Sequence, residues 1–297
     1  MNNNNSIPIG IFDSGVGGLT VFKEIRRAFP IYDIVYFGDT ARVPYGTKSK
    51  ETIIEYSMQN ARFLLQQGVE VIVIACNTAS AFALESLQKV IDMPVIGVID
   101  AGAEAALKAT RNGKIGVIGT EGTVNSHAYR DAIRYQVSGI GYQEVKNPPC
   151  PPLKRRETVG DCPYERGEVE VFEKACPLFV PLAEEGWHEH SVTKQVTEIY
   201  LSDLLKSGID TLVLGCTHYP ILKNVIKEVA GDDVVLVDSA EAVLEHLRVV
   251  LKTPTSTVDT EIIGKDHFYV SDNAEKFARI AKIILKVEEI NIERVSI

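Results

Sequence analysis

Short apolar runs alternate with longer segments of helical periodicity along the first hundred residues. The runs are rich in β-branched residues, which suits strands buried on both faces of a parallel sheet. This β-α-β order predicts a mainly parallel sheet covered by helices on both faces. The expected strands are 9–13, 34–39, 71–76 and 94–100, and the expected helices are about 19–29, 49–67 and 77–90.

The same rhythm restarts after residue 113. Residues 115–120 read IGVIGT and match residues 9–14, which read IGIFDS, and each segment leads into a helix. The fold predicted is therefore α/β, with two pseudo-symmetric domains and a site in the cleft between them. Further strands are expected near 168–173, 211–214, 234–238 and 267–270, and further helices at about 193–207, from 220, 241–251 and from 274.

One stretch of the chain occurs twice. Residues 69–80 read VEVIVIACNTAS and residues 209–220 read IDTLVLGCTHYP, so each copy is an apolar run, a small residue and a cysteine. Because open α/β sheets bind ligands at the carboxyl ends of their strands, Cys76 and Cys216 are expected to share one site. Polar pairs that could cap the next helix or hold an anion follow the cysteines. These pairs are Asn77-Thr78 and Thr217-His218.

An insertion distinguishes the second half from the first. Between 136 and 168 the helical period disappears, and two Pro pairs exclude a continuous helix or a central strand. This range is predicted to be a surface insertion whose role is left open, including whether it covers the site or alters association. The expected domains are 1–99 together with about 240–297, and 100–239.

Composition limits the classes of function. The chain has 297 residues, which suits about two domains, and its net charge of −9 argues against a nucleic-acid partner. It shows neither a signal-peptide pattern at the start nor an apolar run near the ~20 residues of a membrane helix, so we expect a cytoplasmic protein without a membrane partner. Five cysteines is an odd, low count that favours reduced thiols.

Two further loops end predicted strands of the first sheet. Asp13 and Ser14 open a glycine-rich turn before a helix, where an anion could bind, although Asp13 could equally be a helix N-cap. The glycine spacing does not match the dinucleotide pattern G-x-G-x-x-G. Asp39 ends the next strand, and the turn at Tyr45 and Gly46 lies beyond the same sheet edge.

The two repeated cysteines suggest proton transfer. Cys76 and Cys216 precede expected helix N-termini, where the dipole should lower a thiol pKa from about 8.5. One thiolate and one thiol could remove a proton from one face of a carbon and return one to the other face. A zinc site is the alternative for Cys216 with His218, or for Cys150 with Cys162, but further ligands at suitable spacing are missing. Cys176 is expected to be structural.

Five motifs together resemble the glutamate racemases of the aspartate/glutamate racemase superfamily. They are IFDSGVGGLT, YFGDTARVPYG, ACNTAS, EKACPLFVPLAEEG and LGCTHYP. The resemblance implies a homodimer that interconverts L- and D-glutamate without a cofactor or metal and supplies the D-isomer for peptidoglycan. No lysine stands in a motif position to bind pyridoxal phosphate as a Schiff base.

The resemblance also implies roles for individual residues. Cys76 and Cys216 would be the two acid/base groups, assisted by Asp13, His218 and Glu184, with Asp39 as a further candidate. The substrate-binding positions would be Asp13, Ser14, Tyr45, Gly46, Asn77, Thr78, Thr217 and His218.

Two other functions stay open at this point. An aspartate or hydantoin racemase of the same superfamily would use the same two thiols, and the partner of the distal carboxylate would decide between these substrates. A glutamate-binding regulator without turnover would need neither thiol, and the presence of both favours an enzyme.

Overall fold

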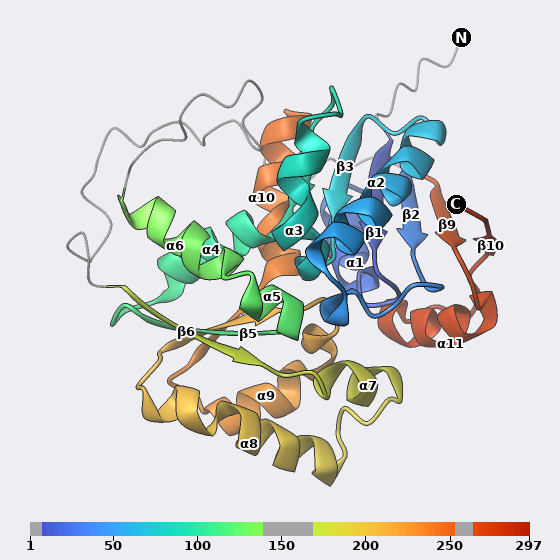
Figure 1. Cartoon of the computed structure of the whole chain (residues 1–297). Helices are drawn as coiled ribbons and strands as arrows, with labels where there is room; N and C mark the ends of the chain where they lie inside the picture. The colour runs from blue at the N-terminus through green and yellow to red at the C-terminus, as the bar shows by residue number, and fades with distance from the viewer. Residues whose placement is uncertain (1–7, 139–168, 253–263) are drawn as a thin grey trace.

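Two parallel β-sheets form the centres of the two halves of the molecule (Figure 1). The computed structural model describes residues 8–138, 169–252 and 264–297. The first sheet has the order β10-β9-β2-β1-β3-β4 and the second has the order β6-β5-β7-β8. The strands are β1 Ile9–Asp13, β2 Ile34–Gly38, β3 Val71–Ile74, β4 Val95–Gly97, β5 Lys114–Gly119, β6 Glu170–Ala175, β7 Thr211–Gly215, β8 Val235–Asp238, β9 Asp266–Val270 and β10 Ile292–Arg294.

Helices cover both faces of each sheet, as the β-α-β pattern predicts. α1, α10 and α11 pack on one face of the first sheet and α2 and α3 on the other, while α7, α8 and α9 lie opposite α4 and α6 on the second. The helices are α1 Leu19–Ala28, α2 Lys50–Gln66, α3 Asn77–Gln88, α4 Val98–Ala109, α5 Glu121–Asn125, α6 Ala128–Ser138, α7 Phe179–Glu184, α8 Ser191–Lys206, α9 Lys223–Ala230, α10 Ser239–Leu251 and α11 Ala274–Leu285, and the 3-10 turns are η1 Tyr45–Thr47 and η2 Tyr219–Leu222.

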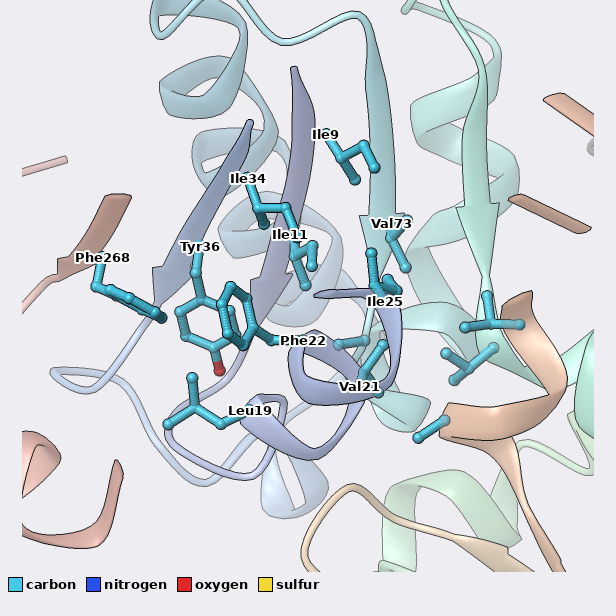
Figure 2. Close-up of a cluster of buried hydrophobic side chains, with 14 of the residues drawn as sticks. Ile9, Ile11, Leu19, Val21, Phe22, Ile25, Ile34, Tyr36, Val73 and Phe268 are labelled. Carbon is cyan, nitrogen blue, oxygen red and sulfur yellow. The ribbon is translucent and has the colours of Figure 1, made fainter. Parts of the chain in front are cut away.

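The central strands of the first sheet are buried on both faces, which explains their continuous apolar runs. Successive side chains of a strand point to opposite faces. Ile9, Ile11 and Tyr36 therefore belong to one core cluster, whereas Phe12 and Phe37 belong to the other. Figure 2 shows the first cluster, in which the β-strands meet apolar side chains of α1. The α/β fold predicted from the repeats is confirmed.

The two sheets repeat one arrangement around their central strands. β1 pairs with β2 and β3, and β5 pairs with β6 and β7 in the same manner. Cys76 and Cys216 therefore follow equivalent strands, β3 and β7. The C-terminal strand β9 pairs with β2, so the end of the chain returns to the first sheet. The predicted domain boundaries stay a prediction.

Some predicted elements were wrong in extent. The strand expected at 94–100 ends at Gly97, because the Ala-rich segment from Val98 forms α4 and the Val98 N–H donates to Ser80 Oγ at 3.3 Å. Residues 136–138 belong to α6 rather than to the insertion, and 139–168 lie outside the described residues. The helix expected from Pro220 begins as the 3-10 turn η2, and β10 was not predicted. No helix in the described ranges is long and apolar enough to span a membrane.

Candidate active site

One narrow cavity lies between the two halves and receives residues from both. The cavity has a volume of about 20 Å³, which suits one or two water molecules. The first half supplies Ser14, Val43, Pro44, Tyr45, Gly46, Cys76, Asn77 and Thr78, and the second supplies Thr120, Val180, Gly215, Cys216, Thr217 and His218. Of the predicted site residues, Asp13, Asp39 and Glu184 do not line it. Both repeated cysteines therefore face the same space.

Cys76 stands at the N-cap of α3 and is buried beside Ser14, its Sγ lying 3.7 Å from Ser14 Oγ. Burial raises the pKa of this thiol to about 12, and the nearby charge of Asp13 adds to the rise. The Ala79 N–H and the Ser14 hydroxyl act in the opposite direction without offsetting it. The expectation that the pKa of this thiol is lower than usual is therefore wrong, because desolvation of the thiolate outweighs the lowering effect of the helix N-terminus.

Cys216 follows β7, and its nearest polar partner is the imidazole of His218. Its Sγ lies 3.9 Å from Nδ1 of His218, and His218 Nε2 lies 3.3 Å from Oε1 of Glu184. The next turn is the 3-10 helix η2, and the α-helix α9 begins only at Lys223. The geometry forms a thiol-imidazole-carboxylate chain, which can hold and pass a proton.

The two partners of Cys216 have opposite pKa shifts. Burial by itself lowers the pKa of His218, but contacts with Cys216 and Glu184 outweigh it and raise the pKa to about 10. The hydrogen bond with His218 lowers the pKa of Glu184 to about 2, with a further contribution from Lys276. At neutral pH the imidazole is therefore cationic and the carboxylate anionic.

Asp13 is buried outside the cavity lining and connects the two halves through Thr217. Its carboxylate accepts hydrogen bonds from the Gly15 N–H at 2.9 Å and from Thr217 Oγ1 at 3.3 Å. Complete burial raises its pKa, against the lowering effect of His218. The N-cap of α1 is Gly18 and has no side-chain cap, so the alternative interpretation of Asp13 as that cap is wrong.

Asp39 supports the 39–47 loop and does not face the cavity. Its buried carboxylate accepts hydrogen bonds from the Tyr45 hydroxyl, from Arg42 Nε at 2.7 Å and from Ser271 Oγ at 2.9 Å. Since the Tyr45 hydroxyl also accepts from Asn60 Nδ2 at 3.0 Å, its polar end is occupied behind the loop. Gly46 completes the same part of the wall.

Three hydroxyl groups meet where Thr78 and Thr120 line the cavity, and the third, that of Thr123, lies outside the lining. Thr78 Oγ1 lies 2.8 Å from Thr120 Oγ1 and 3.1 Å from Thr123 Oγ1, and each hydroxyl can donate or accept. Asn77 accepts a hydrogen bond from Tyr129, but its buried Nδ2 has no partner among the described residues. Sequence reasoning missed Thr120 and Thr123. Thr120 could have been found, because it holds the repeat position of Ser14.

The cysteines considered as zinc ligands are not part of a metal site in the described part of the chain. Within those ranges, no group of three or more His, Cys, Asp or Glu side chains is placed to hold a metal ion. Cys176 is a buried free thiol in the core of the second half, as expected for a structural residue. Cys150 and Cys162 lie outside the described residues.

His218 should make the stability of the fold depend on pH. The folded protein holds its proton up to about pH 10, whereas an ordinary histidine releases it near 6.5. The folded state then binds more protons, so the free energy of unfolding should fall as pH rises above 6.5, by at most about 1.4 kcal/mol per pH unit. Urea unfolding between pH 7 and 8.5 measures this slope. It should be smaller in His218→Gln, and equal slopes would contradict the assignment.

Comparisons with known proteins agree on one family. The family model described as Asp/Glu/Hydantoin racemase matches residues 9–159. The chain is 49% identical over 277 residues to a glutamate racemase of Geobacter metallireducens, covering 93% of this chain and 92% of that protein.

Two solved structures that resemble this chain are also glutamate racemases. A glutamate racemase isoform from Bacillus anthracis superimposes with a TM-score of 0.83 at 35% identity, covering 99% of this chain and 98% of that one. The glutamate racemase of Francisella tularensis, crystallised in complex with D-glutamate, gives a TM-score of 0.79 at 37% identity and covers 98% of both chains.

Proposed function

The chain belongs to the Asp/Glu/hydantoin racemase family, and we propose that it is a glutamate racemase that interconverts L- and D-glutamate with two cysteines and no cofactor. One observation carries the mechanism. Cys76 and Cys216 follow equivalent strands of two repeated sheets and line the same cavity from different halves. Such a pair can act on opposite faces of one carbon, as inversion of the α-carbon requires.

The reaction would transfer one proton on each side of the substrate. One cysteine, as thiolate, removes the α-proton and becomes a thiol, while the other thiol gives its proton to the opposite face and becomes the thiolate. The next turnover in the reverse direction restores the first state. His218, held by Glu184, would stabilise the thiolate form of Cys216. The Ser14 hydroxyl would stabilise the thiolate form of Cys76, whereas the negative charge of Asp13 raises the pKa of that thiol and would favour the form that donates a proton.

The raised pKa of Cys76 is compatible with this role. The α-proton of an amino acid is a weak acid, so a thiolate of high basicity is a better match for it than an ordinary one. A substrate ammonium group beside the thiol would favour the charged form.

The same cavity offers places for both carboxylates of glutamate. The unpartnered Asn77 Nδ2 and the neighbouring Ser14 and Thr217 could hold the α-carboxylate, with His218 nearby. The distal carboxylate could accept hydrogen bonds from the hydroxyls of Thr78 and Thr120, which line the cavity together with Gly46. Hydroxyls that hold the distal carboxylate would favour glutamate over the shorter aspartate. A hydantoin has no free α-carboxylate for the groups at Asn77 to bind.

Opening and closing of the cleft would be part of the cycle. The cavity has room for one or two water molecules, so glutamate can reach the thiols only when the two halves move apart. Closure around the substrate would exclude water and strengthen the interactions of polar groups with the developing charge. This step replaces the electron sink that a cofactor would supply.

The cellular setting is part of the same proposal. The protein would supply D-glutamate for peptidoglycan in the cytoplasm and would act as a homodimer without nucleic-acid or membrane partners. The net charge of −9 supports the absence of a nucleic-acid partner.

Racemisation in D₂O tests the proposal directly. Starting from pure L-glutamate, the optical signal should decay to zero while the D-glutamate formed carries α-deuterium, because the second thiol has exchanged with solvent. The same should hold from D-glutamate, and L-aspartate should react at least tenfold more slowly. A protein that binds glutamate but changes neither signal would be a binding protein, and faster reaction with aspartate would reassign the substrate.

A further inference from the structure

Lys276 connects the C-terminal helix to the second half of the molecule. It lies in the first turn of α11, on the segment whose strand β9 joins the first sheet. Its Nζ lies 2.8 Å from Oε2 of Glu184, at the end of α7. In Figure 1, α11 and α7 approach each other from the two halves. The ion pair therefore spans the two sides of the site.

Lys276 contacts the carboxylate oxygen of Glu184 that does not contact His218. Glu184 Oε1 contacts His218 Nε2 at 3.3 Å, while Oε2 accepts from Lys276 at 2.8 Å. Because both oxygens are held, the carboxylate has a fixed orientation toward the imidazole. The chain of contacts runs from Lys276 through Glu184 and His218 to Cys216.

Other contacts across this side of the site are less accessible. Thr20 Oγ1 donates to the Thr217 carbonyl at 3.1 Å, and Thr217 Oγ1 donates to Asp13. The Lys276 side chain is 46% exposed, whereas that of Glu184 is 16% exposed. Lys276 thus lies at the edge of the closed cleft, where it can break its ion pair when the halves separate.

We propose that Lys276 is a positioning residue, which holds Glu184 against His218 and joins the two halves when the cleft is closed. This inference rests on the proposed racemase function. Lys276 does not line the cavity, so its effect on the reaction would pass through its ion pair with Glu184. An exposed ion pair contributes at most about 1 kcal/mol, which corresponds to roughly a fivefold change.

The variant Lys276→Met tests this role, because it keeps the length of the side chain and removes the charge. We expect kcat to fall two- to fivefold in both directions, and Lys276→Arg to restore most of the loss. The matched control is Lys282→Met on the same helix, since Lys282 is exposed and makes no ion pair with a described residue. That control should keep the parent kcat.

The split between kcat and KM separates positioning from attraction of the substrate. If Lys276 only attracted the anionic substrate, KM would rise and kcat would stay unchanged, which would overturn the inference. A kcat for Lys276→Met equal to that of Lys282→Met would also overturn it. Since the two enantiomers have equal free energies, kcat/KM must change by the same factor in both directions, which checks the assay.

A double-mutant cycle tests the path through Glu184. In the Glu184→Gln background, Lys276→Met should change kcat by less than 1.5-fold, and an undiminished effect there would contradict a path through Glu184. If the Glu184→Gln enzyme shows no turnover, the split between kcat and KM in the single variant decides. Inactivity of the parent itself would instead refute the proposed function.

Discussion

Replacing either Cys76 or Cys216 by serine should abolish glutamate racemisation in both directions, with a loss of at least about 10²–10⁴-fold in kcat. Inversion needs one group on each face of the α-carbon, and both thiols line the same cavity. A serine hydroxyl keeps the shape of the side chain but is far too weak an acid to replace a thiol. Because each direction uses one cysteine as base and the other as acid, neither single variant should retain one direction.

Cys176→Ser is the matched control for these variants. Cys176 is also buried, but it lies in the core of the second half, and its Sγ is 3.7 Å from the Lys174 carbonyl. A serine there can donate to the same carbonyl, so racemisation should remain near the parent rate. Activity is measured from the optical signal of L- and D-glutamate, with circular dichroism to show that the variants fold. Parent-rate racemisation by the double variant of Cys76 and Cys216 would refute the two-thiol mechanism.

The position of the two thiols could be predicted because it depends on local pattern. Each cysteine follows a β-branched run, and parallel sheets place such residues at one edge. The repeat around residues 9–14 and 115–120 likewise indicated two similar halves, and the sheets confirm this. Features that depend only on the sequence of one strand or one helix could therefore be predicted.

The pKa of Cys76 could not be predicted in the same way. The helix N-terminus is local and visible in the sequence, but burial of the thiol and the approach of Asp13 depend on how distant segments pack. The contact of Lys276 with Glu184 joins residues 92 positions apart, and no spacing rule suggests it. Effects that come from tertiary contacts were therefore missed, although the residues themselves lay in recognised motifs or near them.

The glycine-rich turn after β1 shows the same limit. The sequence suggested that its backbone N–H groups bind an anion, but the Gly15 N–H donates to Asp13. Gly18 packs against Asp13 and Tyr36, and Gly17 packs against Thr217 and His218 of the other half. The small residues therefore also serve the close approach of the two halves, which a pattern in one half could not reveal.

Gly17→Ala should lower kcat by about 100-fold while leaving the protein folded, because displacements near 1 Å at a catalytic group can have effects of that size. A Cβ on Gly17 would lie 2.4 Å from Thr217 Oγ1 and 2.5 Å from His218 Nδ1, both far inside contact distance. These side chains cannot easily move away, since Asp13 holds Thr217 and Glu184 holds His218. The added methyl group should therefore push the two halves apart next to Cys216.

Gly15→Ala provides the matched control for this prediction. A Cβ on Gly15 meets its nearest neighbour, Val43 Cγ2, at 3.4 Å, which is an ordinary contact. Its kcat should stay within threefold of the parent, and thermal unfolding should show both variants folded. Since only the Gly17 methyl group opposes closure beside Cys216, a parent-like kcat for Gly17→Ala would mean that the reaction occurs with the two halves farther apart than in this structure.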